Sequence, residues 1–195
     1  MAVSLTKGQK ISLTKDASGN STGLRKAIIG LGWDAAKRGF FGGRDIDCDA
    51  SVILLQNGRF VNDKDLIYYG HKNHESGTVT HCGDNLTGEG DGDDEQIIVN
   101  LDAIPAIYDK IVVVVNIYQA EQRKQDFGLI KNAFMRIVDN DTNQELARFN
   151  LSENYAGMTA MVFGELYRHN GEWKLNAIGQ GTQDGSISQL VRRYQ

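Results

Sequence analysis

Cysteine and proline are scarce in this 195-residue chain, which contains two cysteines and one proline. Cys48 and Cys82 are too few to form the disulfide framework of a small secreted protein. No apolar run approaches the length of a membrane-spanning helix, and the N-terminal residues lack the apolar core of a signal peptide. We therefore expect a cytoplasmic protein without a transmembrane segment.

The chain also lacks an excess of basic residues. Its formal net charge is −4, so no nucleic-acid partner is expected. Six acidic residues and no basic residue fall between positions 84 and 95. Subtracting their −6 from the total of −4 leaves +2 for the rest of the chain. The acidity of the protein is therefore confined to one short segment.

Long helical patterns are absent as well. Apolar and polar residues alternate along the chain, and many of the 22 glycines fall in the turns between apolar runs. Asn57-Gly58 and Asn170-Gly171 are typical of tight hairpins, because both residue types tolerate positive φ. About eleven strands are expected, at 10–14, 25–33, 46–56, 66–69, 78–81, 96–101, 110–118, 129–138, 145–150, 159–168 and 172–178.

Helix is expected only in short pieces, at 103–108, 121–125 and 187–194. Many short strands joined by polar turns are typical of a sandwich or barrel. The sequence predicts a mainly β fold: a single-domain β-sandwich over residues 1–195, with two mixed or antiparallel sheets and a few short helices.

The acidic segment 83–95 has the composition of a cation site. Gly88, Gly90 and Gly92 alternate with acids, and they let the backbone bring oxygens together. Calcium takes about 6–8 oxygen ligands, whereas magnesium keeps its waters. A solvated acidic turn is the alternative interpretation, although a plain hairpin needs no loop of this length. An EF-hand is excluded, because Glu89 stands where that loop requires glycine.

A second acidic group precedes this segment. Asp34 follows Gly32-Trp33, and strand alternation places Asp45, Asp47 and Asp49 on one face of a strand. Three carboxylates on one face repel one another unless cations or basic side chains neutralise them. The residues alone leave both interpretations open.

Several segments together resemble the TerD family of tellurite-resistance and general stress proteins. They are GLGWD, IDCDAS, GTVTHCGDNLTGEGDGDDE, QDFG followed by AF, and FGELYRHNGEWK, at 30–34, 46–51, 77–95, 125–134 and 163–174. The resemblance covers nearly the whole chain. IDCDAS departs from the FDLDAS of many members but keeps both aspartates. Phe-Phe-Gly-Gly at 40–43 looks like the TerZ-type branch of the family.

The resemblance implies a β-sandwich whose loops bind calcium, with two ions expected. Carried over position by position, the ligands would be Asp34, Asp47, Asp49, Asp84, Asn85, Thr87, Gly88, Glu89, Asp91, Asp93, Asp94 and Glu95. Within that set, Thr87 and Gly88 would offer backbone carbonyls. The resemblance also implies a non-enzymatic stress-response protein associated with tellurite resistance.

The function expected from these features is that of a calcium-dependent adaptor. Its partners would be other proteins, tellurite-resistance gene products and a membrane component among them, and these would bring the protein to a membrane. No G-x-S-x-G, Walker or HExxH motif indicates an enzyme.

Two other functions are weighed beside the adaptor. A thiol-based, tellurite-detoxifying redox protein would use Cys48 or Cys82, but the chain has no CxxC. A calcium-dependent carbohydrate-binding module needs exposed aromatic residues beside the metal, and none lies within 83–95. We expect both cysteines to be buried and His71 and His74 to lie at the surface. Zinc is disfavoured, because His81 and Cys82 fall on opposite faces of a strand.

Overall fold

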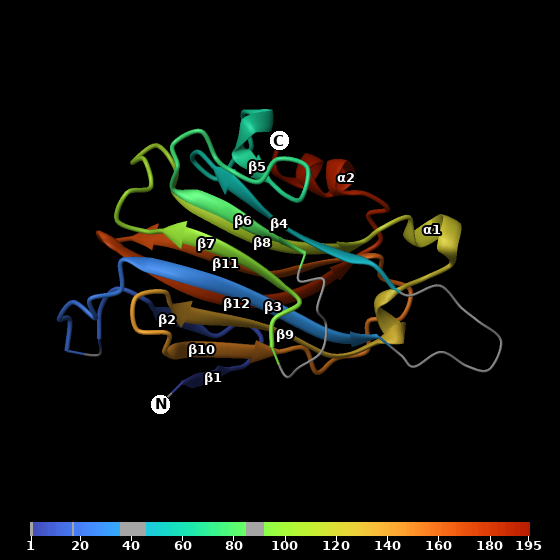
Figure 1. Cartoon of the computed structure of the whole chain (residues 1–195), viewed down its shortest axis with the longest axis horizontal. Coiled ribbons are helices and arrows are strands. Elements are labelled where there is room, and N and C mark those ends of the chain that lie inside the picture. Colours follow the sequence, from blue (N-terminus) through green and yellow to red (C-terminus); the bar gives the residue numbers. More distant parts are fainter. Residues whose placement is uncertain (1, 17, 36–45, 85–91) are drawn as a thin grey trace.

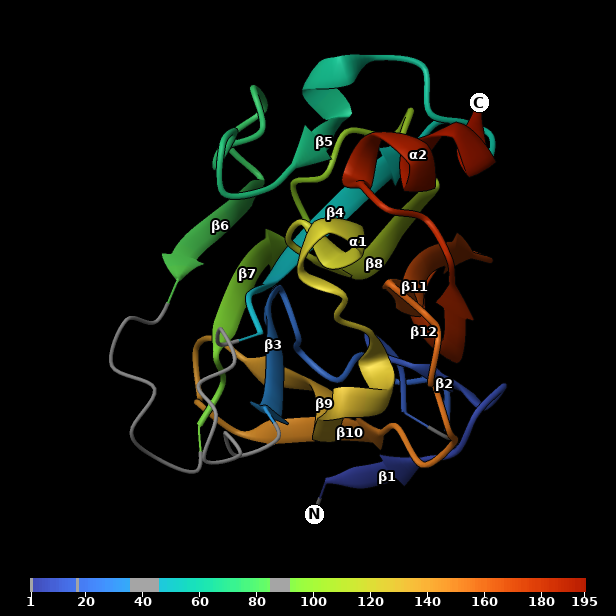
Figure 2. The same ribbon diagram turned by 90° about the vertical axis from the view of Figure 1, so that its right-hand side faces the viewer.

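Alternating apolar residues build two six-stranded sheets, which stack face to face as a sandwich (Figure 1, Figure 2). The computed structural model describes residues 2–16, 18–35, 46–84 and 92–195. The predicted mainly β fold, with two sheets and few short helices, is confirmed.

The first sheet contains, in spatial order, β1 (Val3–Leu5), β10 (Glu145–Asn150), β9 (Ile130–Asp139), β3 (Lys26–Ala35), β7 (Glu95–Asn100) and β6 (Val79–Asp84). The second sheet contains β2 (Lys10–Ser12), β12 (Glu172–Thr182), β11 (Ala160–His169), β8 (Lys110–Ile117), β4 (Cys48–Leu55) and β5 (Leu66–Ile67). Strand β1 pairs with β10 in parallel, and the neighbouring pair β10 and β9 is antiparallel. The first sheet is therefore mixed.

Two α-helices and three single-turn 3₁₀ helices lie among the described residues: α1 (Ala120–Arg123), α2 (Ile187–Val191), η1 (Asp63–Asp65), η2 (Phe127–Leu129) and η3 (Arg192–Tyr194). The helix predicted at 103–108 is wrong, since these residues form turns. Its apolar positions Ile104 and Tyr108 are buried in the core. The two side chains therefore hold a loop against the core and do not form one face of a helix.

The principal core lies between the two sheets. Strand β7 shows the pattern most simply, because Glu95, Ile97 and Val99 are buried while the residues between them are partly exposed. Burying a large aliphatic side chain contributes roughly 1.5–3 kcal/mol. Glu95 points inward on this otherwise apolar face, so its carboxylate needs hydrogen-bond partners or a neutralising charge.

Strands β4 and β8 are buried on both faces. Helix α2 covers the outer face of the second sheet, where Leu190 and Val191 pack with Ile53 and Val112 in a separate apolar cluster. This cover explains why β4 reads as a continuous apolar run rather than as an alternating strand.

Both predicted hairpin turns are confirmed. Asn57 and Gly58 have φ of 52° and 74°, and Asn170 and Gly171 have φ of 51° and 73°. These left-handed conformations match the twist of the flanking strands. In the described part of the chain, no helix is both long and apolar enough to span a membrane.

Candidate metal site

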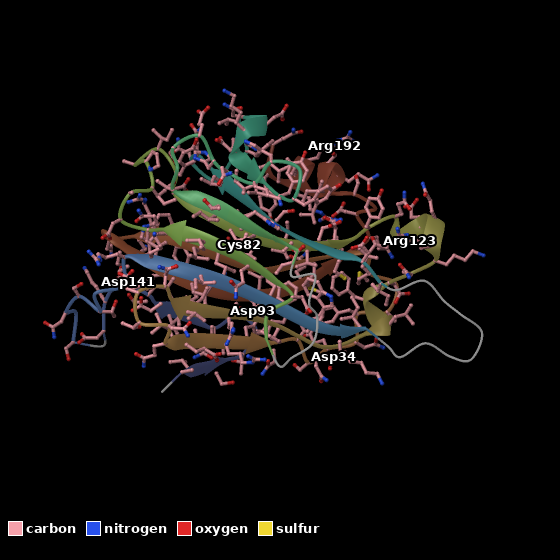
Figure 3. The ribbon with its side chains drawn as sticks, in the orientation of Figure 1. Asp34, Cys82, Asp93, Arg123, Asp141 and Arg192 are labelled. Atoms are coloured by element: carbon pink, nitrogen blue, oxygen red, sulfur yellow. The ribbon has the colours of Figure 1, made fainter. Side chains whose placement is uncertain are left out.

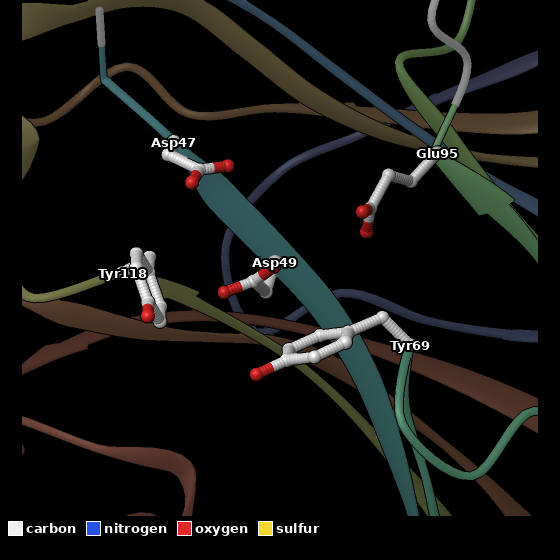
Figure 4. Close-up of a pocket in the computed structure, with 5 residues that line it drawn as sticks. All are labelled: Asp47, Asp49, Tyr69, Glu95 and Tyr118. Carbon is white, nitrogen blue, oxygen red and sulfur yellow. The ribbon is translucent and has the colours of Figure 1, made fainter.

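A pocket at the junction of the two sheets joins carboxylates that are distant in the sequence (Figure 4). Asp47 precedes β4, Asp49 lies within β4, and Glu95 begins β7 in the opposite sheet. Tyr69 and Tyr118 also line this pocket, whose volume is about 350 Å³. All five side chains offer oxygen atoms, the donors that hard cations such as calcium prefer.

Glu95 is held rigidly on the inner side of this pocket. Its side chain is 4% exposed, and the backbone N–H of Ala50 donates to its carboxylate. His81 Nε2 lies 3.7 Å from the same carboxylate and 3.1 Å from the carbonyl oxygen of Ala50, while the N–H of Gly83 donates to His81 Nδ1 at 3.0 Å. Since both imidazole nitrogens are engaged, His81 fixes the surroundings of Glu95 and is not a metal ligand.

Asp49, within β4, and Asp47, just before it, both line the pocket. The intervening Cys48 and the following Ala50 are buried, so the predicted alternation is confirmed at positions 47–50, whereas Asp45 lies outside the described residues. Asp47 is exposed and has a basic neighbour, Arg123, whose Nη1 lies 3.7 Å from its carboxylate. The neutralisation predicted for this acidic face is therefore supplied in part by the chain itself.

Asp93 points away from the pocket. Its carboxylate is fully buried, and Arg136 grips it through Nε at 2.7 Å and Nη2 at 3.1 Å. Gln96 donates a further hydrogen bond at 2.9 Å. The structure thus separates Asp93 from Asp47, Asp49 and Glu95, although the sequence grouped all four as ligands.

Asp94 occupies an intermediate position. Its carboxylate accepts a hydrogen bond from the backbone N–H of Trp33 at 2.7 Å. Burial raises the pKa of Asp94; the bond from Trp33 lowers it, and the nearby carboxylates of Asp34, Asp93 and Glu95 raise it further. The net shift is upward, and its largest cause is the burial of the carboxylate.

Asp34 lies near the end of β3 and is exposed (Figure 3). Asn132 Nδ2 donates to its carboxylate at 2.7 Å. Asp34 does not line the pocket with Asp49 and Glu95.

The rest of the predicted ligand set lies beyond what the structure describes. Asp84 ends β6 with its backbone paired with Glu95, and its side chain lies outside the described part. Also outside the described residues are Asn85, Thr87, Gly88, Glu89 and Asp91. Within the described ranges, no three histidine, cysteine or acidic side chains form a group that could hold a metal ion. The twelve predicted ligands therefore stay a prediction.

The histidine and cysteine residues differ in part from expectation. His81 is buried and Cys82 is exposed, so their predicted placement on opposite faces is confirmed. The predicted burial of Cys82 is wrong, because it lies on the outer face of edge strand β6. The predicted exposure of His74 is also wrong: it is buried, with Nε2 3.3 Å from Asp65.

Sequence reasoning missed three residues around the site: Tyr69, Tyr118 and Arg136. Both tyrosines stand at the C-terminal ends of predicted strands, and this position alone did not mark them as pocket walls. Arg136 gave no signal either, since alternation shows only that it faces outward. Its pairing with Asp93 depends on the neighbouring positions of β9, β3 and β7 in the sheet.

Three comparisons relate the chain to known proteins. The domain profile described as "TerD domain" matches residues 1–194. The chain is 50% identical to "Stress response protein SCP2" of Bacillus subtilis over 100% of both chains. It is 49% identical to "Tellurium resistance protein TerD" of Serratia marcescens, over 96% of this chain and 95% of that protein. A crystal structure of a protein of unknown function matches with a TM-score of 0.67 at 23% identity, covering 86% of this chain and 95% of that one.

Proposed function

The chain belongs to the TerD domain family of tellurium-resistance and general stress proteins, and from this premise we propose that it is a calcium-binding, non-enzymatic stress-response protein. The observation that carries the proposal is that Asp47, Asp49 and Glu95, from both sheets, line one pocket, although these three described side chains do not by themselves form a group that could hold a metal ion. A cation there would join the two layers of the sandwich.

The donor chemistry of this pocket fits calcium. Carboxylates and tyrosine hydroxyls supply oxygen, and no thiol or imidazole belongs to its described lining. The three acids alone do not complete a coordination sphere of about 6–8 oxygens. We assign the remaining ligands to the acidic segment between positions 84 and 91, and two ions are proposed for the whole set.

The upward shift of the pKa of Asp94 supports the same proposal. Burial and neighbouring carboxylates make its ionised form unfavourable in the metal-free protein. A bound divalent cation supplies the opposite charge and relieves this repulsion. Calcium binding would therefore favour the ionised form of Asp94.

As an adaptor, the protein would present a calcium-dependent surface to other proteins, including a membrane component of a tellurite-resistance complex. Tyr69 and Tyr118 support this role, with 51% and 38% of their surface exposed beside the acidic pocket. Exposed tyrosine is enriched at protein interfaces, because an apolar ring and a polar hydroxyl bind with little loss of side-chain entropy.

The same two tyrosines also favour a second candidate function, a calcium-dependent carbohydrate-binding module. Sugars stack on aromatic rings, and both rings adjoin the proposed cation. In such a module, sugar would increase the affinity for calcium. Replacing Tyr69 with alanine would abolish this increase, whereas calcium binding in the absence of sugar would persist.

The thiol-based redox function is the weakest of the three. Burial raises the pKa of Cys48, and partial desolvation raises that of Cys82, which disfavours the thiolate that redox chemistry requires. Cys48 is buried and Cys82 is exposed, so the two thiols occupy unlike environments.

Calorimetric titration of the metal-free protein with calcium tests the main proposal, with magnesium and zinc as competitors. We expect saturable calcium binding that magnesium competes for weakly. Absence of heat with calcium, or displacement of calcium by equimolar zinc, would contradict the assignment.

A further inference from the structure

The three consecutive acids that end the acidic segment are held by three different partners. Asp93 is gripped by Arg136 of β9, and the carboxylate of Asp94 accepts the N–H of Trp33 on β3. Glu95 alone turns inward, to the N–H of Ala50 on β4. Each contact limits how the next residue can be oriented.

The grip on Asp93 uses both of its carboxylate oxygens. Arg136 Nε donates to Oδ1 at 2.7 Å and Nη2 donates to Oδ2 at 3.1 Å, which is the paired geometry that makes arginine–carboxylate bonds strong. The side chain of Asp93 is 0% exposed. To bind a cation, the carboxylate of Asp93 would have to lose its hydrogen bonds to Arg136. The geometry therefore favours a structural role, in which Asp93 fixes this part of the chain in place.

Glycines of β3 provide the space in which the carboxylate of Asp93 sits. A Cβ atom added to Gly30 would collide with the carboxylate of Asp93, and one added to Gly32 would collide with the ring of Phe134. The carboxylate of Asp93 therefore lies directly against the backbone of β3. The carboxylate can occupy this space only because residue 30 has no side chain.

Further contacts hold Arg136 in place. Its Nη1 lies 3.2 Å from Glu145 on β10. Glu145 also lies 3.8 Å from Arg148, whose guanidinium carbon is 3.6 Å from the ring centroid of Phe134. These contacts link strands β3, β9 and β10 to the described end of the acidic segment.

We propose that Arg136 and Asp93 form a clamp that positions Glu95 for the cation, and that Asp93 is not itself a ligand. The proposal rests on the proposed calcium function for its effect on affinity, although the clamp itself stands on the geometry alone. Arg136 is thus a positioning residue that acts through the backbone of residues 93–95.

The direction in which calcium affinity changes when Arg136 is replaced distinguishes the clamp from a role of Asp93 as a metal ligand. If Asp93 were a ligand, replacing Arg136 with glutamine would remove a competing positive charge and strengthen calcium binding. The clamp predicts the reverse: Arg136→Gln weakens calcium binding about tenfold, as expected when charge-assisted hydrogen bonds that preorganise a site are lost. Arg25→Gln, which removes an equal charge on an exposed pair with Asp141, should leave the affinity unchanged.

Three further variants strengthen the test. Gly30→Ala displaces Asp93 without changing any charge, so it should also weaken calcium binding. Asp93→Asn and Arg136→Gln should be non-additive when combined, because either change opens the same clamp. Arg136→Lys keeps the charge but not the paired geometry, and it should restore only part of the affinity.

A readout without metal keeps the clamp testable if the protein binds no calcium. The amides of Asp94 and Trp33 donate to Leu31 and to Asp94. In folded Arg136→Gln, we expect both amides to exchange hydrogen faster than in the wild type. Unchanged exchange would overturn the clamp, as would stronger calcium binding by Arg136→Gln. Absent calcium binding with faster exchange would reject the proposed function and support the clamp as a structural device.

Discussion

At the scale of single residues, Glu95 is the position where fold and proposed function meet. It occupies an inward position of β7 that Ile97 and Val99 continue as apolar core. A carboxylate buried in this way is unfavourable unless it is hydrogen-bonded and neutralised. The N–H of Ala50 supplies the hydrogen bond, and the proposed calcium ion would supply the neutralising charge.

We expect Glu95→Gln to weaken calcium binding at least tenfold, which is about 1.4 kcal/mol. The amide keeps an oxygen that accepts the N–H of Ala50 but loses the negative charge. Calorimetric titration measures the change. Glu153→Gln is the matched control, because Glu153 is half-exposed and pairs with Lys7. Equal effects of the two substitutions would show that Glu95 does not contact the ion.

Asp94 predicts how the metal-free protein responds to pH. Its folded-state pKa is raised above the ordinary 3.8, so its negative charge destabilises the fold at neutral pH. This destabilisation decreases as the pH falls through the folded-state pKa, and it is absent below about 3.8. Metal-free Asp94→Asn should therefore melt at a higher temperature than the wild type at pH 7, and the difference should shrink toward pH 4.

Asp141→Asn is the comparison for this measurement. Arg25 donates to Asp141 and holds the pKa of that carboxyl below its usual range. Its replacement should give no stabilisation at pH 7. If Asp94→Asn were less stable than Asp141→Asn in EDTA, the negative charge of Asp94 would not destabilise the metal-free fold.

Cys82 tests the rival thiol function. Partial desolvation raises its pKa above the ordinary 9.0, so its alkylation by iodoacetamide should reach half its maximal rate above pH 9. In urea the midpoint should fall toward the ordinary value. Rapid alkylation of the folded protein at pH 7 would instead indicate an activated thiolate and favour the redox function.

At the scale of elements, local patterns were enough to predict most strands. Positions 110–118 and 145–150 were visible because apolar residues recur along them and turn residues bound them. Strand β1 was not predicted, because three residues in parallel pairing with β10 carry too short a pattern. Pairing partners are not encoded locally either, and for this reason the Arg136–Asp93 clamp could not be predicted.

Helix α2 was predicted from its amphipathic pattern, and its role follows from the outer face of the second sheet. Leu190 is fully buried there against Ile53 and Val112. Leu190→Ala should lower the free energy of unfolding by about 2–5 kcal/mol, because it removes apolar contacts and leaves a cavity. Urea denaturation measures the loss. Exposed Arg192→Ala should change it by less than about 0.5 kcal/mol.

At the scale of the whole molecule, the acids of the pocket come from both layers of the sandwich. Asp47 and Asp49 belong to the second sheet and Glu95 to the first, as Figure 4 shows. The sequence identified these acids and their shared strand face, since both follow from composition and alternation. It did not reveal that Asp34 and Asp93 turn elsewhere, because that depends on the partners Asn132 and Arg136. The TerZ-type positions 40–43 lie outside the described residues.

A cation that joins two layers binds the folded state and not the unfolded chain, so it must stabilise the fold. Scanning calorimetry of the protein in calcium and in EDTA therefore tests the central claim most directly. At about 100 times Kd, calcium should add roughly 2.7 kcal/mol per site. For a chain of this size the melting temperature should rise by roughly 5–10 °C per site. Equal melting temperatures in calcium and in EDTA would contradict the account.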